Sequence, residues 1–398
     1  SGYYRRNRNN YVLIQIEINK NIYTSSKYKK QPSKADGMMM MNKGKLLLAN
    51  GMEFEGECFG AEGTVIGEIV FTTSATGYQE TLSDPDYHGQ IVAQTFPLIG
   101  NYGTNEEDYA SGKCHAKGYL VREWCDTPSN FRMDDNIDHF LKKHHIVGLC
   151  GIDTRKLTHI LREQGVMNGA IYTNGNINKA ELLEEIKNYT ILNPVAEVTV
   201  GEPYYYPAAE EKYKVAVMDY GCKKSMIDEL LKRGCSVTLL PALTGAEEVK
   251  KLDVDGIVLS DGPGNPDDNV KEIANLKSIA GLGLPMFGVS LGHQLLALAM
   301  GAKTVKLKHG HRGASQPVVD LTENRTFVTA QNHGYAVENE SITADLGKIS
   351  HINANDKTCE GIQYTAIPAF SVQFQPNVIR YQSAPESEYD KFIQMLQK

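Results

Sequence analysis

Ser290 is the residue whose surroundings most clearly indicate chemistry. An apolar run over residues 284–289 precedes it, and Gly292 opens a stretch with the periodicity of an amphipathic helix. Gly288-x-Ser290-x-Gly292 has the spacing of a nucleophile elbow, a sharp strand-to-helix turn that raises one side chain above a parallel sheet. Glycines are needed because so tight a turn leaves no room for side chains. The spacing locates an active site but leaves open whether the Ser290 hydroxyl can react.

The elements around Ser290 predict the sheet that would carry this turn. Short apolar runs alternate with a helical pattern at residues 225–233, and these runs cover residues 214–218, 236–240, 256–259 and 284–289. Such alternation is typical of an α/β domain with a mainly parallel sheet. Function in these sheets lies at the carboxyl ends of the strands. The loops expected there are 219–222, 260–266 and the turn at Ser290.

The first half of the chain predicts a β-rich domain. Runs of β-branched and aromatic residues between 46 and 77 are broken by Gly and Asn, which favours strands and hairpins. One helix is predicted to begin at a cap formed by Asp153 or Thr154 and to end at Gly165. We expect domains over 42–200 and 213–398, joined by a proline- and tyrosine-containing linker over 201–212.

Composition excludes several classes of protein. The chain has 398 residues, 41% of them hydrophobic and 22% charged, which suits two or three globular domains. No apolar run approaches the roughly 18–20 residues of a membrane span. Seven cysteines without a C-x-x-C pair indicate reduced thiols in the cytoplasm rather than disulfides or a zinc site. The net charge of −7 argues against a nucleic-acid partner.

Residues 1–41 differ from the rest of the chain. Residues 1–36 hold eight basic and two acidic residues and lack the uninterrupted apolar segment of a signal peptide. We expect a leader outside the fold, either disordered or left over from cloning, as the opening Ser-Gly suggests.

Longer motifs in both halves carry a family resemblance. They are TGYQETLSDPDYHGQIV (76–92), GNYGTN (100–105), IDTRKLTHILREQG (152–165), LSDGPGNP (259–266), SLGHQLLALAMGAKTVKLKHGHRG (290–313) and TAQNHGYAV (329–337). With these motifs, residues 43–398 resemble the small, glutamine-hydrolysing subunit of carbamoyl-phosphate synthase. Each short glycine motif is weak alone, but the set is highly specific.

The resemblance implies a small-subunit N-terminal domain followed by a class I glutamine amidotransferase domain of flavodoxin-like type. In this family a cysteine thiolate at the elbow attacks the glutamine amide, a histidine transfers the proton, and a glutamate orients the histidine. The ammonia passes to a large subunit that makes carbamoyl phosphate for arginine or pyrimidine biosynthesis. That subunit is the expected partner and would bind ATP and magnesium. No cofactor, metal, nucleic acid or membrane is expected for this chain.

All three catalytic positions of the family are changed. Ser290 stands at the cysteine position, Gln375 at the histidine position and Asn377 at the glutamate position. A thiol with a pKa of about 8.5 is readily activated, whereas a serine hydroxyl needs a positioned base. Gln375 cannot act as that base, and Asn377 cannot stabilise an imidazolium. Loss of a nucleophile or base costs on the order of a million-fold in kcat in a model serine protease. Glutamine hydrolysis is therefore predicted to be severely impaired or lost.

Other positions match the family's substrate pocket. In the family, a glycine loop and the backbone N–H after the nucleophile form an oxyanion hole; the matching residues here are Gly262, Gly264 and Leu291. The positions that hold glutamine correspond to Gln294, Asn332, Gly334 and Tyr335. Asp86 replaces a serine that contacts the substrate, and Asp261 replaces an asparagine. A carboxylate at the pocket would repel the carboxylate of glutamine, so binding is in doubt as well.

Several residues have a functional and a structural interpretation. Ser290 could serve a serine hydrolase, but the structural alternative, a hydroxyl that caps the next helix, is favoured. For each of the others we also favour a structural role. His293 could replace the missing base, and His309 with His311 could bind a metal, but a satisfied structural histidine and a solvated or loop-anchoring pair are favoured. His333 is expected to hold the shape of its loop. Cys222 could be a displaced nucleophile, and Lys303, Lys306 and Lys308 a basic patch, but a free buried thiol and a solvated strand face are favoured. The three lysines alternate with Val305 and Leu307, which suggests the solvated face of a strand.

Three functions stay open. The chain could be a weakly active glutaminase subunit, a structural or regulatory partner of a large subunit that uses free ammonia, or an engineered inactive variant. A single Cys-to-Ser change would suffice to trap an enzyme, so the additional changes at Gln375 and Asn377 argue against the third. We favour the structural or regulatory role within this family.

Overall fold

The computed structural model describes residues 42–173, 177–379 and 387–397. The predicted leader, residues 1–41, lies outside the described residues. Residues 42–398 form one compact unit. None of the described helices is both long enough and apolar enough to cross a lipid bilayer.

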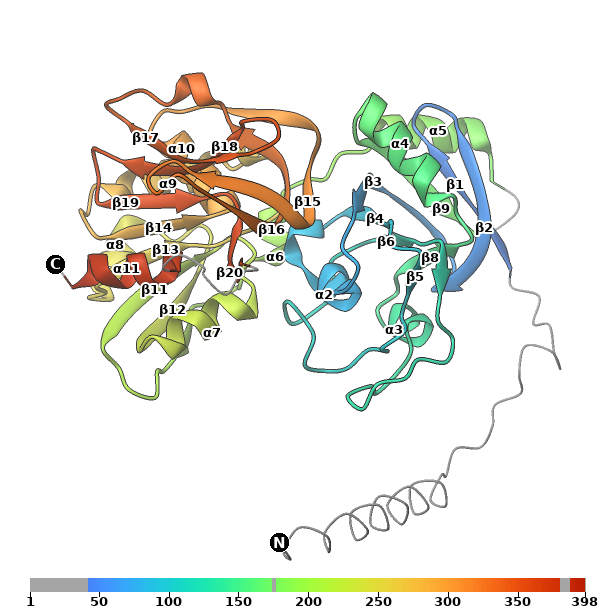
Figure 1. The fold of residues 1–398 in the computed structure, drawn as a ribbon, viewed down its shortest axis with the longest axis horizontal. Coiled ribbons are helices and arrows are strands. Elements are labelled where there is room, and N and C mark those ends of the chain that lie inside the picture. Colours follow the sequence, from blue (N-terminus) through green and yellow to red (C-terminus); the bar gives the residue numbers. More distant parts are fainter. Residues whose placement is uncertain (1–41, 174–176, 380–386, 398) are drawn as a thin grey trace, which may run out of the picture. The chain divides into compact units, whose positions relative to one another are not determined.

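The first part of this unit is a β-barrel (Figure 1). In the described residues seven strands close it in the order β1-β2-β8-β6-β4-β3-β9. Their bounds are β1 Lys43–Leu48, β2 Glu53–Gly60, β3 Thr64–Thr72, β4 Gln90–Gln94, β6 Gly118–Leu120, β8 Val147–Cys150 and β9 Met167–Tyr172. A separate small sheet pairs β5 Leu98–Ile99 with β7 Glu123–Trp124. The β-rich N-terminal domain expected from the sequence is confirmed.

Helices and short turns surround the barrel. They are α2 Tyr78–Ser83, η1 Pro85–Tyr87, α3 Ile137–Lys143, α4 Thr154–Gln164 and α5 Lys179–Asn188. The next helix, α6 Pro194–Val198, packs its Val195 into the core of the second part. The predicted helix is α4, and its cap is Asp153, whose side chain accepts a hydrogen bond from the Lys156 N–H at 2.9 Å. Gly165 ends it with a φ of 93°. Three buried residues of α4, Leu157, Ile160 and Leu161, pack against barrel side chains, as the helical periodicity predicts.

The second part is built on one large sheet. Within the described residues it has 11 strands in the order β10-β12-β11-β13-β14-β19-β18-β17-β15-β16-β20. Their bounds are β10 Tyr204–Tyr206, β11 Tyr213–Asp219, β12 Cys235–Pro241, β13 Gly256–Leu259, β14 Met286–Val289, β15 Thr304–Asp320, β16 Arg325–Val337, β17 Gly347–Asn353, β18 Cys359–Tyr364, β19 Ala369–Val372 and β20 Gln375–Ile379. The strands from β12 to β19 in this order are parallel, whereas those beyond β19 are antiparallel.

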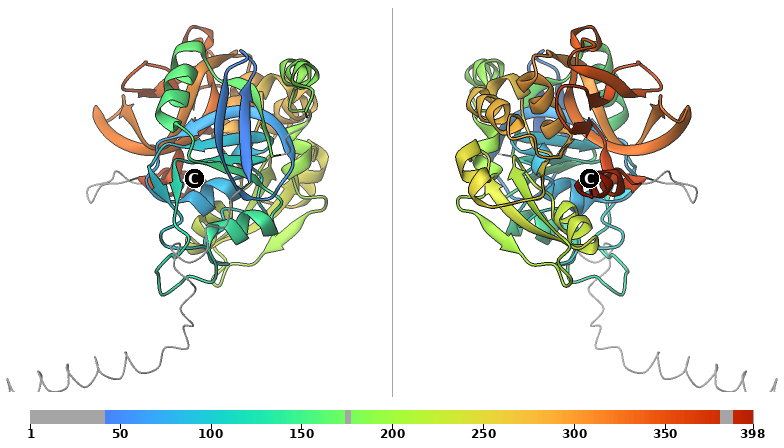
Figure 2. Two further views of the ribbon diagram at one scale, coloured as in Figure 1. Left: turned by 90° about the vertical axis from the view of Figure 1, so that its right-hand side faces the viewer. Right: turned by 90° about the vertical axis from the view of Figure 1, so that its left-hand side faces the viewer.

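Helices cover both faces of the parallel strands (Figures 1 and 2). Side chains from α8 Ala246–Lys251, α9 Val270–Ala280 and α10 Leu291–Ala299 fill one buried cluster with the sheet. Side chains from α7 Lys224–Lys232 and α11 Glu388–Leu396 fill the other. Two short helical turns are η2 Pro266–Asp268 and η3 Asn339–Ser341. This layered α/β arrangement is the one predicted, and it places the ends of β11, β13 and β14 side by side.

The predicted linker contains a strand. Within residues 201–212, β10 pairs antiparallel with β12, with Tyr204 opposite Leu239 and Tyr206 opposite Val237. The tyrosine cluster therefore extends the sheet at its edge. Tyr204 and Tyr205 remain more than half exposed, at 58% and 55%, which suits an edge strand.

Candidate functional site

The turn at Ser290 has the backbone of a strand-to-helix elbow. β14 ends at Val289, α10 begins at Leu291, and Ser290 between them has φ 51° and ψ −109°. A side chain on Gly292 would collide with the Leu259 main chain, which explains the glycine there. A positive φ at a non-glycine residue stores strain and is most often found at functional sites. The elbow predicted from the sequence is thus confirmed.

The expected capping role of Ser290 is wrong. Ser290 occupies the N-cap position of α10, but its side chain makes no capping hydrogen bond to the described backbone. The reason is the positive φ, since a capping serine normally has an extended backbone conformation. Ser290 is only 2% exposed and lines an internal cavity instead. The hydroxyl is therefore displayed toward a cavity rather than used to support the helix.

The Ser290 cavity has a volume of about 430 Å³ and gathers most of the predicted pocket residues. Those that line it are Asp86, Gly262, Gly264, Ser290, Gln294, Asn332, Gly334 and Tyr335. They come from η1, from the loop after β13, from the elbow and from β16. The cavity also has charged residues that the sequence analysis did not place there, namely Glu68, Asp268, Lys306 and Arg312.

The glycine loop after β13 is shaped by close backbone contacts. A Cβ on Gly262 would overlap the Tyr220 carbonyl, so only glycine fits between the two loops. Gly264 has φ +94°, which other residues rarely adopt. Leu291 occupies the first position of α10, where an N–H has no acceptor within the helix. Its side chain is buried in the core, so only its backbone could serve the expected oxyanion hole.

Gln294 is held firmly by its amide nitrogen. Its Nε2 donates to the Tyr335 carbonyl at 2.7 Å and to the Gln373 Oε1 at 2.8 Å. Both N–H groups of the amide are used, so Oε1 is the atom left for a ligand. Asn332 offers the opposite chemistry, because its buried Nδ2 has no partner among the described residues. The cavity thus presents one amide acceptor and one amide donor.

Gln375 and Asn377 do not line the Ser290 cavity. Both line a neighbouring cavity of about 450 Å³, and Asn332 is among the residues that line both. They lie on β20, an edge strand that pairs with β16. Gln375 donates from Nε2 to the Asp261 Oδ2 at 3.2 Å, while Asn377 is exposed. The three positions expected to form a triad are therefore divided between two cavities.

A buried lysine lies between these two cavities, and the sequence analysis missed it. Lys223, at the start of α7, places Nζ 2.8 Å from Asp86, 2.8 Å from Asp261 and 3.0 Å from Asp84. Burial disfavours its charged form, but the three carboxylates outweigh burial and raise the pKa of Lys223 well above its usual value. Burial, together with the neighbouring carboxylates, raises the pKa of Asp84 and raises that of Asp86 well above its usual value. We call these four residues the Lys223 cluster.

The Lys223 cluster changes the expectation for Asp86. One oxygen of Asp86 is bound by Lys223, and the other is buried without a partner among the described residues. Because an ammonium lies beside it and its pKa is raised, Asp86 repels a ligand carboxylate less than its sequence position suggests. A signal was present in the sequence, since three aspartates in two site loops need a nearby counter-ion.

The histidines near the elbow do not act on Ser290. His293 is fully buried, its Nδ1 lies 2.8 Å from the Ser371 Oγ, and burial lowers its pKa to about 3. His333 lines the Ser290 cavity, but its ring nitrogens face the Tyr335 carbonyl at 2.7 Å and the Gln331 Oε1 at 2.8 Å. The structural interpretation of both histidines is therefore confirmed. The His293 Nε2 is buried without a hydrogen-bond partner among the described residues, but His293 does not line the Ser290 cavity and its low pKa makes it a poor base.

Two other sequence interpretations concern Cys222 and the three lysines. Burial raises the pKa of the Cys222 thiol well above its usual value, which agrees with an unreactive cysteine. Lys306 is not a simple solvated lysine, because its Nζ binds the Glu68 Oε1 at 2.9 Å and lies over the Tyr335 ring. Lys303, Lys306 and Lys308 are all exposed and the last two lie on β15, which confirms the solvated strand face, although Val305 is also 46% exposed and so departs from the predicted alternation.

Comparison with known proteins agrees with this fold. The first part matches the family model described as carbamoyl-phosphate synthase small chain, CPSase domain, over residues 46–171. The second part matches glutamine amidotransferase class-I over residues 216–395. The molecule is thus a two-domain protein with a class I glutamine amidotransferase domain.

Curated relatives narrow the assignment further. The carbamoyl phosphate synthase small chain of Listeria monocytogenes is 44% identical over 89% of this chain and 97% of its own length. That of Syntrophotalea carbinolica is 42% identical, with the same coverage of both chains. This chain belongs to the carbamoyl-phosphate synthase small-chain family. A solved glutamine amidotransferase from Thermotoga maritima is 19% identical, with a TM-score of 0.34 over 42% of this chain and 78% of that chain.

Proposed function

We propose that this chain is a carbamoyl-phosphate synthase small subunit that hydrolyses glutamine very slowly or not at all, and that its main role is structural or regulatory. It would bind a large synthetase subunit, which holds ATP and magnesium and uses ammonia from solution. The observation that carries the proposal is that Ser290 occupies an intact elbow while Gln375 and Asn377, which offer no base and no carboxylate, line a different cavity.

The chemistry of the site supports this proposal. To attack glutamine, the Ser290 hydroxyl must lose its proton to a nearby base. Gln375 is an amide, and its Nε2 is directed at Asp261 rather than at the elbow cavity. The ring nitrogens of His293 and His333 are buried and depressed in basicity. Amide acceptors and donors at Gln294 and Asn332 remain, so weak binding of glutamine without turnover is compatible with the cavity.

The decisive experiment compares two nitrogen sources. The chain is combined with a large subunit of the family, and carbamoyl phosphate synthesis is measured with glutamine and with ammonium. We expect ammonium to support synthesis and glutamine to give no more than background. Glutamine-dependent synthesis that disappears in Ser290→Ala would overturn the proposal, because it would require a working nucleophile.

Restoring the family residues provides a matched control. Ser290→Cys, Gln375→His and Asn377→Glu are combined, with and without Asp86→Ser. In the triple variant a histidine at 375 would lie beside Asp261, and the pocket would still contain Asp86. We expect more glutamine hydrolysis in the quadruple variant than in the triple one. Equal, wild-type-like inactivity of both would show that strand β20 itself holds residues 375 and 377 away from the elbow.

Two alternatives make different predictions. An engineered inactive variant would regain full activity once Ser290→Cys, Gln375→His and Asn377→Glu are combined, because the rest of its site would still be that of an active enzyme. A serine hydrolase would hydrolyse activated esters and label Ser290 with a fluorophosphonate probe. A serine hydrolase needs a histidine base at its serine, but His293 does not line the Ser290 cavity and both ring nitrogens of His333 face other groups, which disfavours this second alternative.

A further inference from the structure

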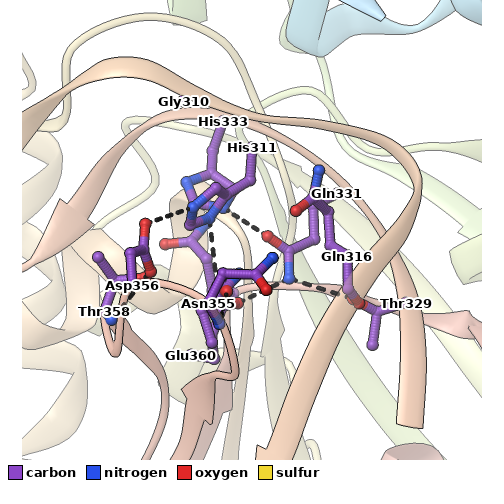
Figure 3. Close-up of polar contacts among 12 residues, drawn as sticks. Gly310, His311, Gln316, Thr329, Gln331, His333, Asn355, Asp356, Thr358 and Glu360 are labelled. Atoms are coloured by element: carbon purple, nitrogen blue, oxygen red, sulfur yellow. Dashed lines mark hydrogen bonds and ion pairs between the residues drawn. The ribbon is translucent and has the colours of Figure 1, made fainter. Parts of the chain in front are cut away.

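Two histidines and a glutamate form a cluster (Figure 3), and one of them, His333, lines the Ser290 cavity. His311 on β15 and His333 on β16 are register partners, and their rings are 4.9 Å apart and nearly perpendicular. Glu360 reaches them from β18 and is fully buried. One ligand atom from each of the three residues lies within 4.8 Å of the others. The sequence analysis rejected a metal pair of His309 with His311 and did not consider Glu360.

The hydrogen bonds of His333 leave its Nε2 facing another hydrogen-bond acceptor. Its Nδ1 is 2.7 Å from the Tyr335 carbonyl, which can only accept, so Nδ1 carries the proton. In the neutral ring Nε2 is then a bare lone pair, yet it faces the Gln331 Oε1 at 2.8 Å. Two acceptors face each other. A second proton would place a positive charge on a ring that is buried away from water, which costs free energy.

Turning the Gln331 amide removes the conflict at His333 only if Glu360 is protonated, a state that burial favours because it raises the pKa of Glu360. The Gln331 Nε2 donates to the Glu360 Oε2 at 2.9 Å and to the Thr329 Oγ1 at 3.1 Å (Figure 3). The reversed amide would place its oxygen against a Glu360 oxygen, which is tolerable only for a protonated carboxyl. The Thr329 hydroxyl already donates to the Gln316 carbonyl at 3.0 Å. A cation bound to the His333 Nε2 and the Gln331 Oε1 would remove the conflict without reversing the amide, once these two atoms move apart from 2.8 Å to the roughly 3.4 Å of a tetrahedral site.

His311 and Glu360 are spaced like two ligands of one metal ion, and a carboxylate behind His311 orients its ring. The His311 Nδ1 lies 3.3 Å from the Glu360 Oε1 but forms no hydrogen bond with it, so this nitrogen is buried without a hydrogen-bond partner among the described residues. Ligands of a tetrahedral zinc ion at roughly 2.0–2.1 Å are separated by about 3.4 Å, which is close to this distance. The other nitrogen, Nε2, binds the Asp356 Oδ2 at 2.8 Å. A carboxylate behind a ligating histidine is the usual second partner at zinc sites.

We propose that His311 Nδ1, His333 Nε2 and Glu360 Oε1 bind a divalent cation of the zinc class, with Gln331 Oε1 as the fourth ligand. Two imidazoles and one carboxylate form a known zinc ligand set. The ion would link β15, β16 and β18 beside the Ser290 cavity, which His333 lines. Its binding does not depend on whether the chain hydrolyses glutamine.

The alternative is a proton-only network. Burial would lower the pKa of His311, but Asp356 and Glu360 raise it to about 9, so an imidazolium could balance Glu360 without an ion. That network leaves the His333 and Gln331 acceptors facing each other. A metal-binding measurement therefore distinguishes the proposed metal site from the proton-only network.

The test is a metal titration of the full chain after treatment with a chelator. Zn²⁺ is titrated by calorimetry, and Co²⁺ is added in parallel because its visible absorption reports tetrahedral coordination. We expect one ion per chain in the wild type and in the control His309→Gln, whose ring Nδ1 faces the Gly310 carbonyl instead. His333→Gln and Glu360→Gln should each weaken binding at least about 100-fold.

A further variant keeps the result clear if these substitutions prevent folding, which circular dichroism would reveal. His311→Cys retains a ligand atom, so it should still bind Co²⁺ and add a sulfur-to-metal charge-transfer band. The proposal is overturned if the wild type binds no ion. It is also overturned if the folded His333→Gln and Glu360→Gln variants bind as tightly as the wild type, or if the His311→Cys complex shows no sulfur band.

Discussion

Removing the ammonium of Lys223 should destabilise the protein strongly and in a pH-dependent way. At an effective dielectric constant of about 20, a charge pair at the observed 2.8–3.0 Å is worth about 6 kcal/mol. Two carboxylate oxygens that each lie 2.8 Å from Nζ are at most about 5.6 Å apart, so each such pair repels by at least about 3 kcal/mol. Desolvation offsets much of the attraction, and loss of one buried partner typically costs about 3–5 kcal/mol. We expect this loss for Lys223→Met near pH 8.

The sign of the pH dependence follows from the carboxylates. Asp84 and Asp86 already have raised pKa values, and loss of Lys223 would raise them further. A carboxyl whose pKa is higher in the folded than in the unfolded protein binds more protons when folded. Its contribution is therefore most favourable below the unfolded pKa and is lost as the pH rises through the folded pKa. The destabilisation by Lys223→Met should accordingly be smaller at about pH 5.5 than at about pH 8.

Urea denaturation followed by circular dichroism at both pH values measures this effect. Lys224→Met is the matched control, because Lys224 is the next residue and its side chain is exposed; it should change the unfolding free energy by less than about 0.5 kcal/mol. Adding Asp86→Ser to Lys223→Met should recover at least about 1 kcal/mol, since it removes one uncompensated carboxylate. A loss below about 1 kcal/mol, or an equal loss at both pH values, would refute the reasoning.

Two further predictions concern stability. Gly262→Ala would place a methyl group on the Tyr220 carbonyl, and we expect a loss of about 1–3 kcal/mol, seen as a lower melting temperature; an unchanged melting temperature would contradict it. The second concerns Asp320, whose pKa lies well below its usual value although burial would raise it. His351 lies 3.6 Å away, and Asp320 accepts hydrogen bonds from the Thr322 N–H at 2.7 Å and from the Thr322 hydroxyl at 2.6 Å. The stabilisation from the ionised Asp320 is present above about pH 4 and is lost as the pH falls further. Asp320→Asn should therefore lower the unfolding free energy by about 1–3 kcal/mol near pH 7 and make it depend less on pH on the acid side. An unchanged plot of unfolding free energy against pH would contradict this.

The sequence was sufficient to predict those parts of the molecule that depend on local residue patterns. The elbow at Ser290 is recognisable because glycine spacing alone permits the turn, and α4 because capping and periodicity agree. Strands β11 and β13 were found because buried parallel strands are short apolar runs. Their order in the sheet and the closure of the barrel are long-range pairings that such patterns do not specify.

The parts that the sequence did not reveal depend on contacts between distant residues. Lys223 is separated by 137 positions from Asp86, with which it forms an ion pair. Glu360 meets His311 and His333 only because β18, β15 and β16 lie in one sheet. Ser290 was wrongly expected to cap α10 because the sequence does not show a positive φ. Gln375 and Asn377 match the catalytic positions by sequence, but the cavity that they line follows from the pairing of β20 with β16.

The central claim is that the Ser290 hydroxyl, for which neither His293 nor His333 is available as a base in the described residues, does not attack glutamine. The most direct measurement incubates the purified chain with isotopically labelled glutamine, follows ammonia release, and analyses the Ser290 peptide by mass spectrometry. We predict that the wild type and Ser290→Ala release ammonia at the same background rate and that the peptide is unmodified. A glutamyl ester on Ser290, or ammonia release that Ser290→Ala abolishes, would contradict the claim.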